Sequence, residues 1–183
     1  MSDRSGLKWV KLKRFISLMF QPESMTTYQS VSRFEDISIE RLKTDGIEGV
    51  LIDADGTLGP DHARQYSDAV VGHVLKMKES GLKVAIFTNA REDRFHQFPG
   101  IPVVSDVPAK PAPEGFLKAM EHFLELENPA QVCMIGDNYL TDGGAVKAGM
   151  LFLYVEPIPG PENFIHKWTR DWAFKRCKSN TSP

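Results

Sequence analysis

From residue 49 onward, short apolar runs alternate with longer amphipathic segments. The runs are rich in Val and Ile and nearly uninterrupted, which is typical of strands buried on both faces of a parallel sheet. The pattern therefore predicts strands at residues 50–52, 84–87, 103–104, 132–135 and 151–155.

Helical periodicity fills the intervals between these runs. Residues 68–79 carry apolar side chains at every third or fourth position, and residues 113–126 and 141–149 are further helix candidates. Alternating strands and helices predict an α/β fold, a three-layer sandwich with a central parallel sheet. In such folds, ligands bind beyond the carboxyl ends of the strands.

Polar residues gather at that edge of the predicted sheet. Two acids end the first strand, a Thr-Asn pair ends the second, a lysine follows the third, and two further acids follow the fourth. Each signal alone has an ordinary explanation as a turn, a helix cap or a surface lysine. Their convergence on one edge favours an active site. The residues are Asp53, Asp55, Thr88, Asn89, Lys110, Asp137 and Asp142.

The carboxylate pair after the first strand indicates phosphoryl chemistry. Residues two apart on a strand point to the same side. Asp53 could therefore attack phosphorus as a nucleophile, while Asp55 protonates the leaving oxygen and later deprotonates a water molecule.

A phosphate placed beside several acids requires cations. Mg²⁺ is bound by carboxylate, carbonyl and phosphate oxygens. We expect Asp53 and Asp137 to supply carboxylates and Asp142 to join or orient these ligands. Lys110 would neutralise further phosphate charge as a compact cation.

The remaining candidates would hold the phosphoryl group. The Thr88 hydroxyl and the backbone N–H groups around Asp55 and Gly56 would bind its oxygens. Gly56 would also let the backbone turn sharply after the strand. We place Thr57 and Asn89 among the substrate-binding residues as well.

In this order, the residues resemble the motifs of the haloacid dehalogenase (HAD) superfamily of phosphotransferases. Those motifs are Asp-x-Asp-x-Thr, a Thr or Ser after the next strand, a Lys, and an acidic pair. Here they are Asp53, Asp55 and Thr57, then Thr88, then Lys110, and finally Asp137 with Asp142. The resemblance implies a HAD-like Rossmannoid fold and a Mg²⁺-dependent phosphatase. It further implies a phospho-aspartate on Asp53, with the Asp55 carbonyl as an added Mg²⁺ ligand.

Two further features narrow the resemblance. The segments after the first two strands are too short for a large cap domain, as in the capless subclass IIIA, so we expect an open site. Residues 14–58, and the segment that begins Gly-Asp-Asn-Tyr at Gly136, look like the IIIA branch that includes phosphatidylglycerophosphate phosphatases. The chain departs from that branch at Gly56, where Asn is usual, and at Asn138, where Gln is frequent.

The two ends of the chain are basic and its body is acidic. Residues 1–20 carry a formal charge of +4, residues 162–183 carry +3, and the remainder carries −9. Both ends place apolar residues that include Trp at helical spacing, with Lys and Arg nearby, which is typical of helices that bind an anionic membrane surface. Alternatively, these helices pack on the domain or on a partner subunit.

This distribution predicts three parts. They are a basic amphipathic segment with its lead-in (residues 1–46), a HAD-like catalytic domain (residues 47–160) and a basic C-terminal helix (residues 161–183). Cys133 and Cys177 form no spaced cluster, which fits reduced thiols, and Cys133 lies in an apolar run that predicts burial. We expect a cytoplasmic protein with no nucleic-acid partner. Peripheral attachment to the inner membrane face is a hypothesis, and the oligomeric state stays open.

Three functions follow from these patterns. We favour a phosphatase of phosphatidylglycerophosphate or a related lipid phosphate. The alternatives are a phosphatase of a small soluble phosphomonoester, such as a sugar phosphate or nucleotide, and a binding module without turnover. The complete set of acids with Lys110 argues against the binding module.

Overall fold

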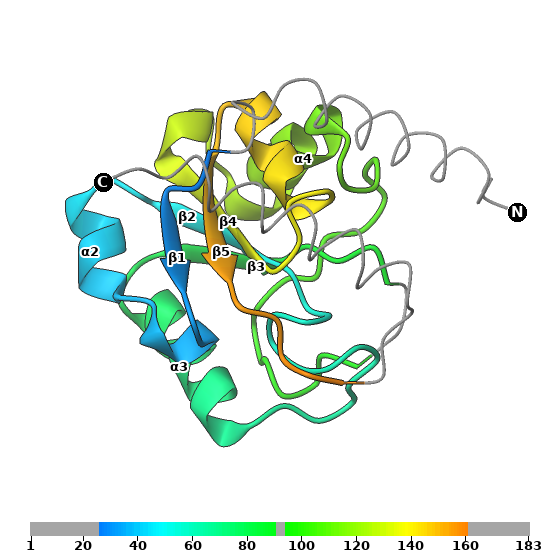
Figure 1. Ribbon diagram of the computed structural model, residues 1–183. Coiled ribbons are helices and arrows are strands. Elements are labelled where there is room, and N and C mark those ends of the chain that lie inside the picture. Colours follow the sequence, from blue (N-terminus) through cyan, green and yellow to red (C-terminus); the bar gives the residue numbers. More distant parts are fainter. Residues whose placement is uncertain (1–25, 91–93, 161–183) are drawn as a thin grey trace, which may run out of the picture.

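Five parallel strands form one sheet in the order β1-β5-β4-β2-β3 in the computed structural model, which describes residues 26–90 and 94–160. Helices cover both faces of this sheet (Figure 1). The predicted α/β fold with a central parallel sheet is confirmed. The strands are β1 (Gln29–Val31), β2 (Gly49–Ile52), β3 (Lys83–Ile86), β4 (Val132–Gly136) and β5 (Leu151–Val155).

The helices divide between the two faces. On one face lie η2 (Phe34–Asp36), α2 (Ile39–Thr44) and α3 (Asp68–Glu79). On the other face lie α4 (Pro113–Ala119), the π-helical turn η3 (Met120–Leu124) and the 3-10 helix η5 (Asp142–Ala148), while the short 3-10 turn η4 (Pro129–Gln131) precedes β4. Helix α3 has the bounds that the sequence predicts. None of the helices in the described ranges is long and apolar enough to cross a membrane.

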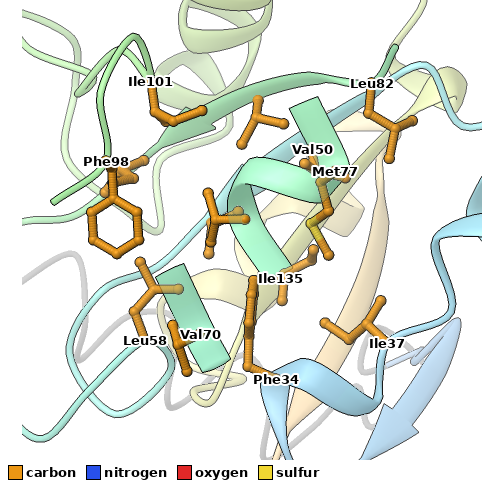
Figure 2. Packing of buried hydrophobic residues seen from close by; sticks show 14 of the residues in the cluster. Phe34, Ile37, Val50, Leu58, Val70, Met77, Leu82, Phe98, Ile101 and Ile135 are labelled. Atoms are coloured by element: carbon orange, nitrogen blue, oxygen red, sulfur yellow. The ribbon is translucent and has the colours of Figure 1, made fainter. Parts of the chain in front are cut away.

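Side-chain alternation along β2 builds a separate core on each face. Val50 and Ile52 pack in the cluster that α3 covers, and Leu51 packs in the opposite cluster. All three side chains are buried because β2 lies between β3 and β4. Figure 2 shows the first cluster, in which Phe34, Val70 and Met77 pack together with Val50 and Ile135.

Cys133 on β4 is buried, as the sequence predicts. Burial raises the pKa of its thiol to about 12. The thiol therefore acts as a small apolar group in the core and not as a nucleophile.

Three predicted elements take a different form. Residues 103–104 make a single bridge to Ile86 and no full strand. Pro102 lacks an N–H that could pair before them, and the chain turns after them at Asp106, whose φ is 57°. The predicted helix 113–126 becomes α4 followed by the wider turn η3 and ends at Glu125, where φ is 52°. The predicted helix 141–149 is the 3-10 helix η5.

Part of the lead-in belongs to the same sheet and core as the later strands. Strand β1 pairs in parallel with β5, and Phe34, Ile37 and Leu42 are buried in the core beneath α3. The sheet and core therefore begin well before residue 47, where we expected the catalytic domain to start. The predicted basic ends fall in residues 1–25 and 161–183, which lie outside the described residues. Residues 26–46 of the lead-in are described.

Candidate active site

The carboxyl ends of β2, β3 and β4 meet at one edge of the sheet. Ile52 on β2 pairs with Ile86 on β3 and with Ile135 on β4, so the three strands end level with one another. Asp53 directly follows β2, and its N–H donates to the Ile135 carbonyl at 2.9 Å. The register therefore brings the polar residues that follow these strands to one place.

Lys110 joins two of the predicted acids. Its Nζ lies 2.6 Å from Oδ1 of Asp53 and 2.6 Å from Oδ1 of Asp142. All three residues are buried. Burial disfavours the Lys110 cation, but the charges of Asp142 and Asp53 outweigh this effect and raise the lysine pKa above its ordinary value. A fixed positive charge therefore stands beside the predicted nucleophile.

Asn89 holds the backbone of Lys110 in place. Its Nδ2 donates to the Lys110 carbonyl at 3.1 Å, and its Oδ1 accepts from the Lys110 N–H at 3.0 Å. This reciprocal pair links the end of β3 to the lysine loop. Both ends of this amide bond to the backbone of Lys110, so Asn89 positions the lysine, and our prediction that it also binds substrate stays a prediction.

Three carboxylates form a candidate metal centre. Asp53, Asp137 and Asp142 each offer an oxygen, and these oxygens lie within 4.8 Å of one another. Mg²⁺ binds oxygens at about 2.0–2.1 Å, so the ligands of one ion lie roughly 3–4 Å apart. Hard carboxylate oxygens in this arrangement fit Mg²⁺ after small side-chain movements. Asp142 also accepts from the Asn138 N–H at 3.1 Å, which fixes its orientation.

The environment of Asp53 favours its protonated form more than water does when no metal is bound. Burial and the nearby charge of Asp142 raise its pKa to about 7, although Lys110 opposes this shift. A divalent cation would favour the carboxylate, which is the form that a nucleophile needs. Metal binding and readiness for attack are therefore coupled at this residue.

Gly56 lies against the carboxylate of Asp137. Its φ is +84°, and a Cβ at this position would lie 2.5 Å from Oδ2 of Asp137. Glycine suits this backbone conformation, and a side chain here would have to displace the Asp137 carboxylate.

The carboxylate of Asp55 is bound to a buried arginine. Arg94 donates from Nη1 to Oδ1 and from Nη2 to Oδ2, each at 2.7 Å, and the His62 N–H donates to Oδ1 at 2.8 Å. Partial burial opposes ionisation of Asp55, but the bonds from Arg94 and His62 outweigh it and lower its pKa below the ordinary value. Asp55 is thus ionised here.

Arg94 was not among the residues predicted from the sequence. It lies in a stretch of mixed charge, Arg-Glu-Asp-Arg, that is typical of an exposed surface. Its side chain is only 1% exposed. The next residue is Phe95, whose side chain is buried. This apolar neighbour is the sequence signal that could have indicated an inward-pointing arginine.

The other predicted phosphate contacts divide into two groups. Thr88 is largely buried, and its Oγ1 accepts from the Ala90 N–H at 3.1 Å, which leaves the hydroxyl proton for another acceptor. The Gly56 N–H donates to the Gly59 carbonyl at 2.8 Å, so it serves the loop. Thr57 has no exposed surface. Substrate binding by Gly56 and Thr57 therefore stays a prediction.

The family model of haloacid dehalogenase-like hydrolases matches residues 33–149. The chain belongs to this family. It is 31% identical over 138 residues to a probable phosphatase, YqeG, from Bacillus subtilis (strain 168), and the match covers 73% of this chain and 78% of that protein.

A solved structure shares the fold, and others are similar to part of it. One crystal structure has a TM-score of 0.53 at 12% identity and covers 73% of this chain and 84% of its own. A crystal structure of an uncharacterized protein from Listeria monocytogenes serotype 4b has a TM-score of 0.48 at 19% identity, with 64% and 85% covered. Family membership makes this haloacid dehalogenase-like chain a hydrolase, and the motif residues Asp53, Lys110, Asp137 and Asp142 lie together at its sheet edge.

Proposed function

We propose that this haloacid dehalogenase-like hydrolase is a Mg²⁺-dependent phosphatase that forms a phospho-aspartate on Asp53. The observation that carries the proposal is the contact of Lys110 Nζ with Asp53 and Asp142 at 2.6 Å each, beside the carboxylate of Asp137. This arrangement joins a nucleophile, a fixed cation and a metal ligand set within one small volume. The probable phosphatase YqeG among its relatives agrees with it.

In the first half of the reaction, an oxygen of Asp53 attacks phosphorus and the bond to the leaving oxygen breaks. Once its pair with Arg94 has weakened and it has taken up a proton from solvent, Asp55 gives that proton to the leaving oxygen, and an acyl phosphate remains on Asp53. Lys110 balances the negative charge of the phosphoryl group, and the Thr88 hydroxyl donates to one of its oxygens. Mg²⁺, held by Asp53, Asp137 and Asp142 with the Asp55 carbonyl, would supply further charge stabilisation.

In the second half, water attacks the phosphorus of the acyl phosphate. Asp55, now a carboxylate, takes the proton from that water. The bond between phosphorus and Asp53 breaks, and inorganic phosphate and the free carboxylate of Asp53 are released. The same residue therefore acts first as an acid and then as a base.

For the substrate, we propose phosphatidylglycerophosphate or a related lipid phosphate. The likeness of residues 14–58 to the phosphatidylglycerophosphate phosphatase branch supports this substrate, and so do the short segments 53–67 and 87–109, which would leave the site open to a headgroup at a membrane surface. The basic ends that would bind the membrane lie outside the described residues. A soluble phosphomonoester is the second candidate.

Acid quenching during turnover tests the chemistry. Protein stopped in the steady state should carry the mass of one phosphoryl group on the peptide that contains Asp53, and Asp53→Asn should carry none and keep under about 1% of the activity. Turnover by the Asn variant would overturn the assignment. Assays with phosphatidylglycerophosphate in vesicles and with sugar phosphates and nucleotides then distinguish the two substrates. Sedimentation with anionic vesicles, with and without residues 1–20 and 162–183, tests the membrane role.

A further inference from the structure

A cleft of about 640 Å³ opens beside the proposed phosphate site. Residues from three stretches line it: residues 87–90 after β3, residues 95–96, and residues 103–109 before Lys110. Thr88, the predicted phosphate contact, is part of its wall, and so is Ala109, the neighbour of Lys110. The cleft is therefore continuous with the catalytic edge of the sheet.

The walls of the cleft are apolar in their deeper part. Phe87, Phe95 and Val104 are buried at 2%, 8% and 7% exposure, and Val103 and Val107 are half-buried. A phosphate group gains nothing from such a surface, because anions are stabilised by cations and N–H donors. Apolar walls instead favour a hydrocarbon group that is removed from water.

The rim of the cleft is polar. His96, Ser105 and Asp106 are exposed there and offer hydrogen-bonding groups. Among the described lining residues, Asp106 is an acid and no residue is Lys or Arg. This rim offers hydrogen bonds to hydroxyl groups of the leaving group.

We infer that this cleft binds the leaving group of the substrate, and that this group is an alcohol with a hydrocarbon portion of several carbon atoms. The inference rests on the proposed function, because it places the phosphoryl group at Thr88 and Lys110. The alcohol could come from a lipid or from a soluble metabolite, since both present the same chemistry to the cleft.

A homologous series of substrates tests the inference. We expect kcat/KM to rise from methyl to butyl to hexyl phosphate, by up to about fourfold for each methylene that becomes fully buried. Val107→Asn should lower the ratio of hexyl to methyl phosphate at least about threefold. Val146→Asn is the matched control, because Val146 is also half-buried against the same core but does not line the cleft. It should leave the ratio unchanged.

Binding of hexylphosphonate and methylphosphonate with Mg²⁺, measured by calorimetry, separates the cleft from the chemistry. One outcome is that no ester is hydrolysed, but hexylphosphonate binds more tightly than methylphosphonate and Val107→Asn removes this difference in affinity. In that case, the inference about the cleft is supported and the proposed function is wrong. If esters are hydrolysed with a flat chain-length dependence, or Val107→Asn leaves the ratio intact, the inference is overturned alone. Comparing hexyl phosphate with a lipid phosphate in vesicles identifies the source of the alcohol.

Discussion

Arg94 binds Asp55 through two parallel hydrogen bonds, each 2.7 Å long. The arginine side chain is 1% exposed and that of Asp55 is 25% exposed. Because a guanidinium keeps its proton in proteins, Asp55 is a carboxylate in this pair. It is therefore prepared to accept a proton from water, whereas donating a proton to a leaving oxygen requires the pair to weaken first.

The pair also predicts a stability effect. Asp55→Asn leaves a buried guanidinium without its counter-charge, which should lower the free energy of unfolding by about 3 kcal/mol. Arg94→Met should also destabilise the protein, but the double variant should recover part of the summed loss. Urea unfolding of the four proteins gives the coupling free energy. A value under about 0.5 kcal/mol would show that the two residues are independent.

The proton-transfer role of Asp55 predicts a dependence on the leaving group. An alkoxide leaves poorly without a proton, whereas p-nitrophenolate needs little help. Asp55→Asn should therefore slow the hydrolysis of butyl phosphate far more than that of p-nitrophenyl phosphate. Because the variant is also destabilised, both rates are measured on the same folded sample at low temperature. Equal losses on the two substrates would indicate a structural role.

The alternation of apolar runs with amphipathic segments was enough to predict the parallel sheet and helix α3. The strand ends were enough to bring Asp53, Asp137 and Asp142 to one edge, because parallel strands must end there together. Strand β1 was not predicted, since Gln29–Val31 is a three-residue edge strand without an apolar run.

Side-chain partners could not be predicted in the same way. Asn89 has the residue type of a substrate ligand, but its amide is bound to the backbone of Lys110. Thr57 belongs to the predicted motif and yet is fully buried. Both outcomes depend on contacts between loops that are far apart in the sequence. A local sequence pattern does not predict such contacts.

The raised pKa of Asp53 predicts how stability depends on pH when no metal is bound. The pKa is about 7 in the folded protein and about 3.9 in an unfolded chain. The folded state therefore binds the proton more tightly, and this contribution is fully present below pH ~4 and is lost as pH rises toward about 7.

Asn at this position cannot titrate, so Asp53→Asn isolates the effect. In EDTA, the unfolding free energy of the wild type relative to this variant should fall by about 2–4 kcal/mol between pH 4 and 7 and then level off. Saturating Mg²⁺ should remove much of the fall. Asp68→Asn, at an exposed carboxylate in the first turn of α3, is the control. A difference that does not change with pH would contradict the raised pKa.

Finally, the contact of Gly56 with Asp137 predicts that a methyl group at residue 56 weakens metal binding. Ala at a φ of +84° costs about 1–2 kcal/mol of backbone strain, and its Cβ would also push the Asp137 carboxylate away. Gly81→Ala is the matched control, because Gly81 has a φ of +93° and a Cβ there would meet no atom within 4 Å. Both variants should lose similar stability in EDTA, with any excess at residue 56 measuring the contact itself. Only Gly56→Ala should weaken Mg²⁺ binding, by about 10-fold or more in calorimetry. Equal Mg²⁺ affinity in the two variants would mean that the position of Asp137 does not limit metal binding, and the ligand set proposed here would have to exclude Asp137.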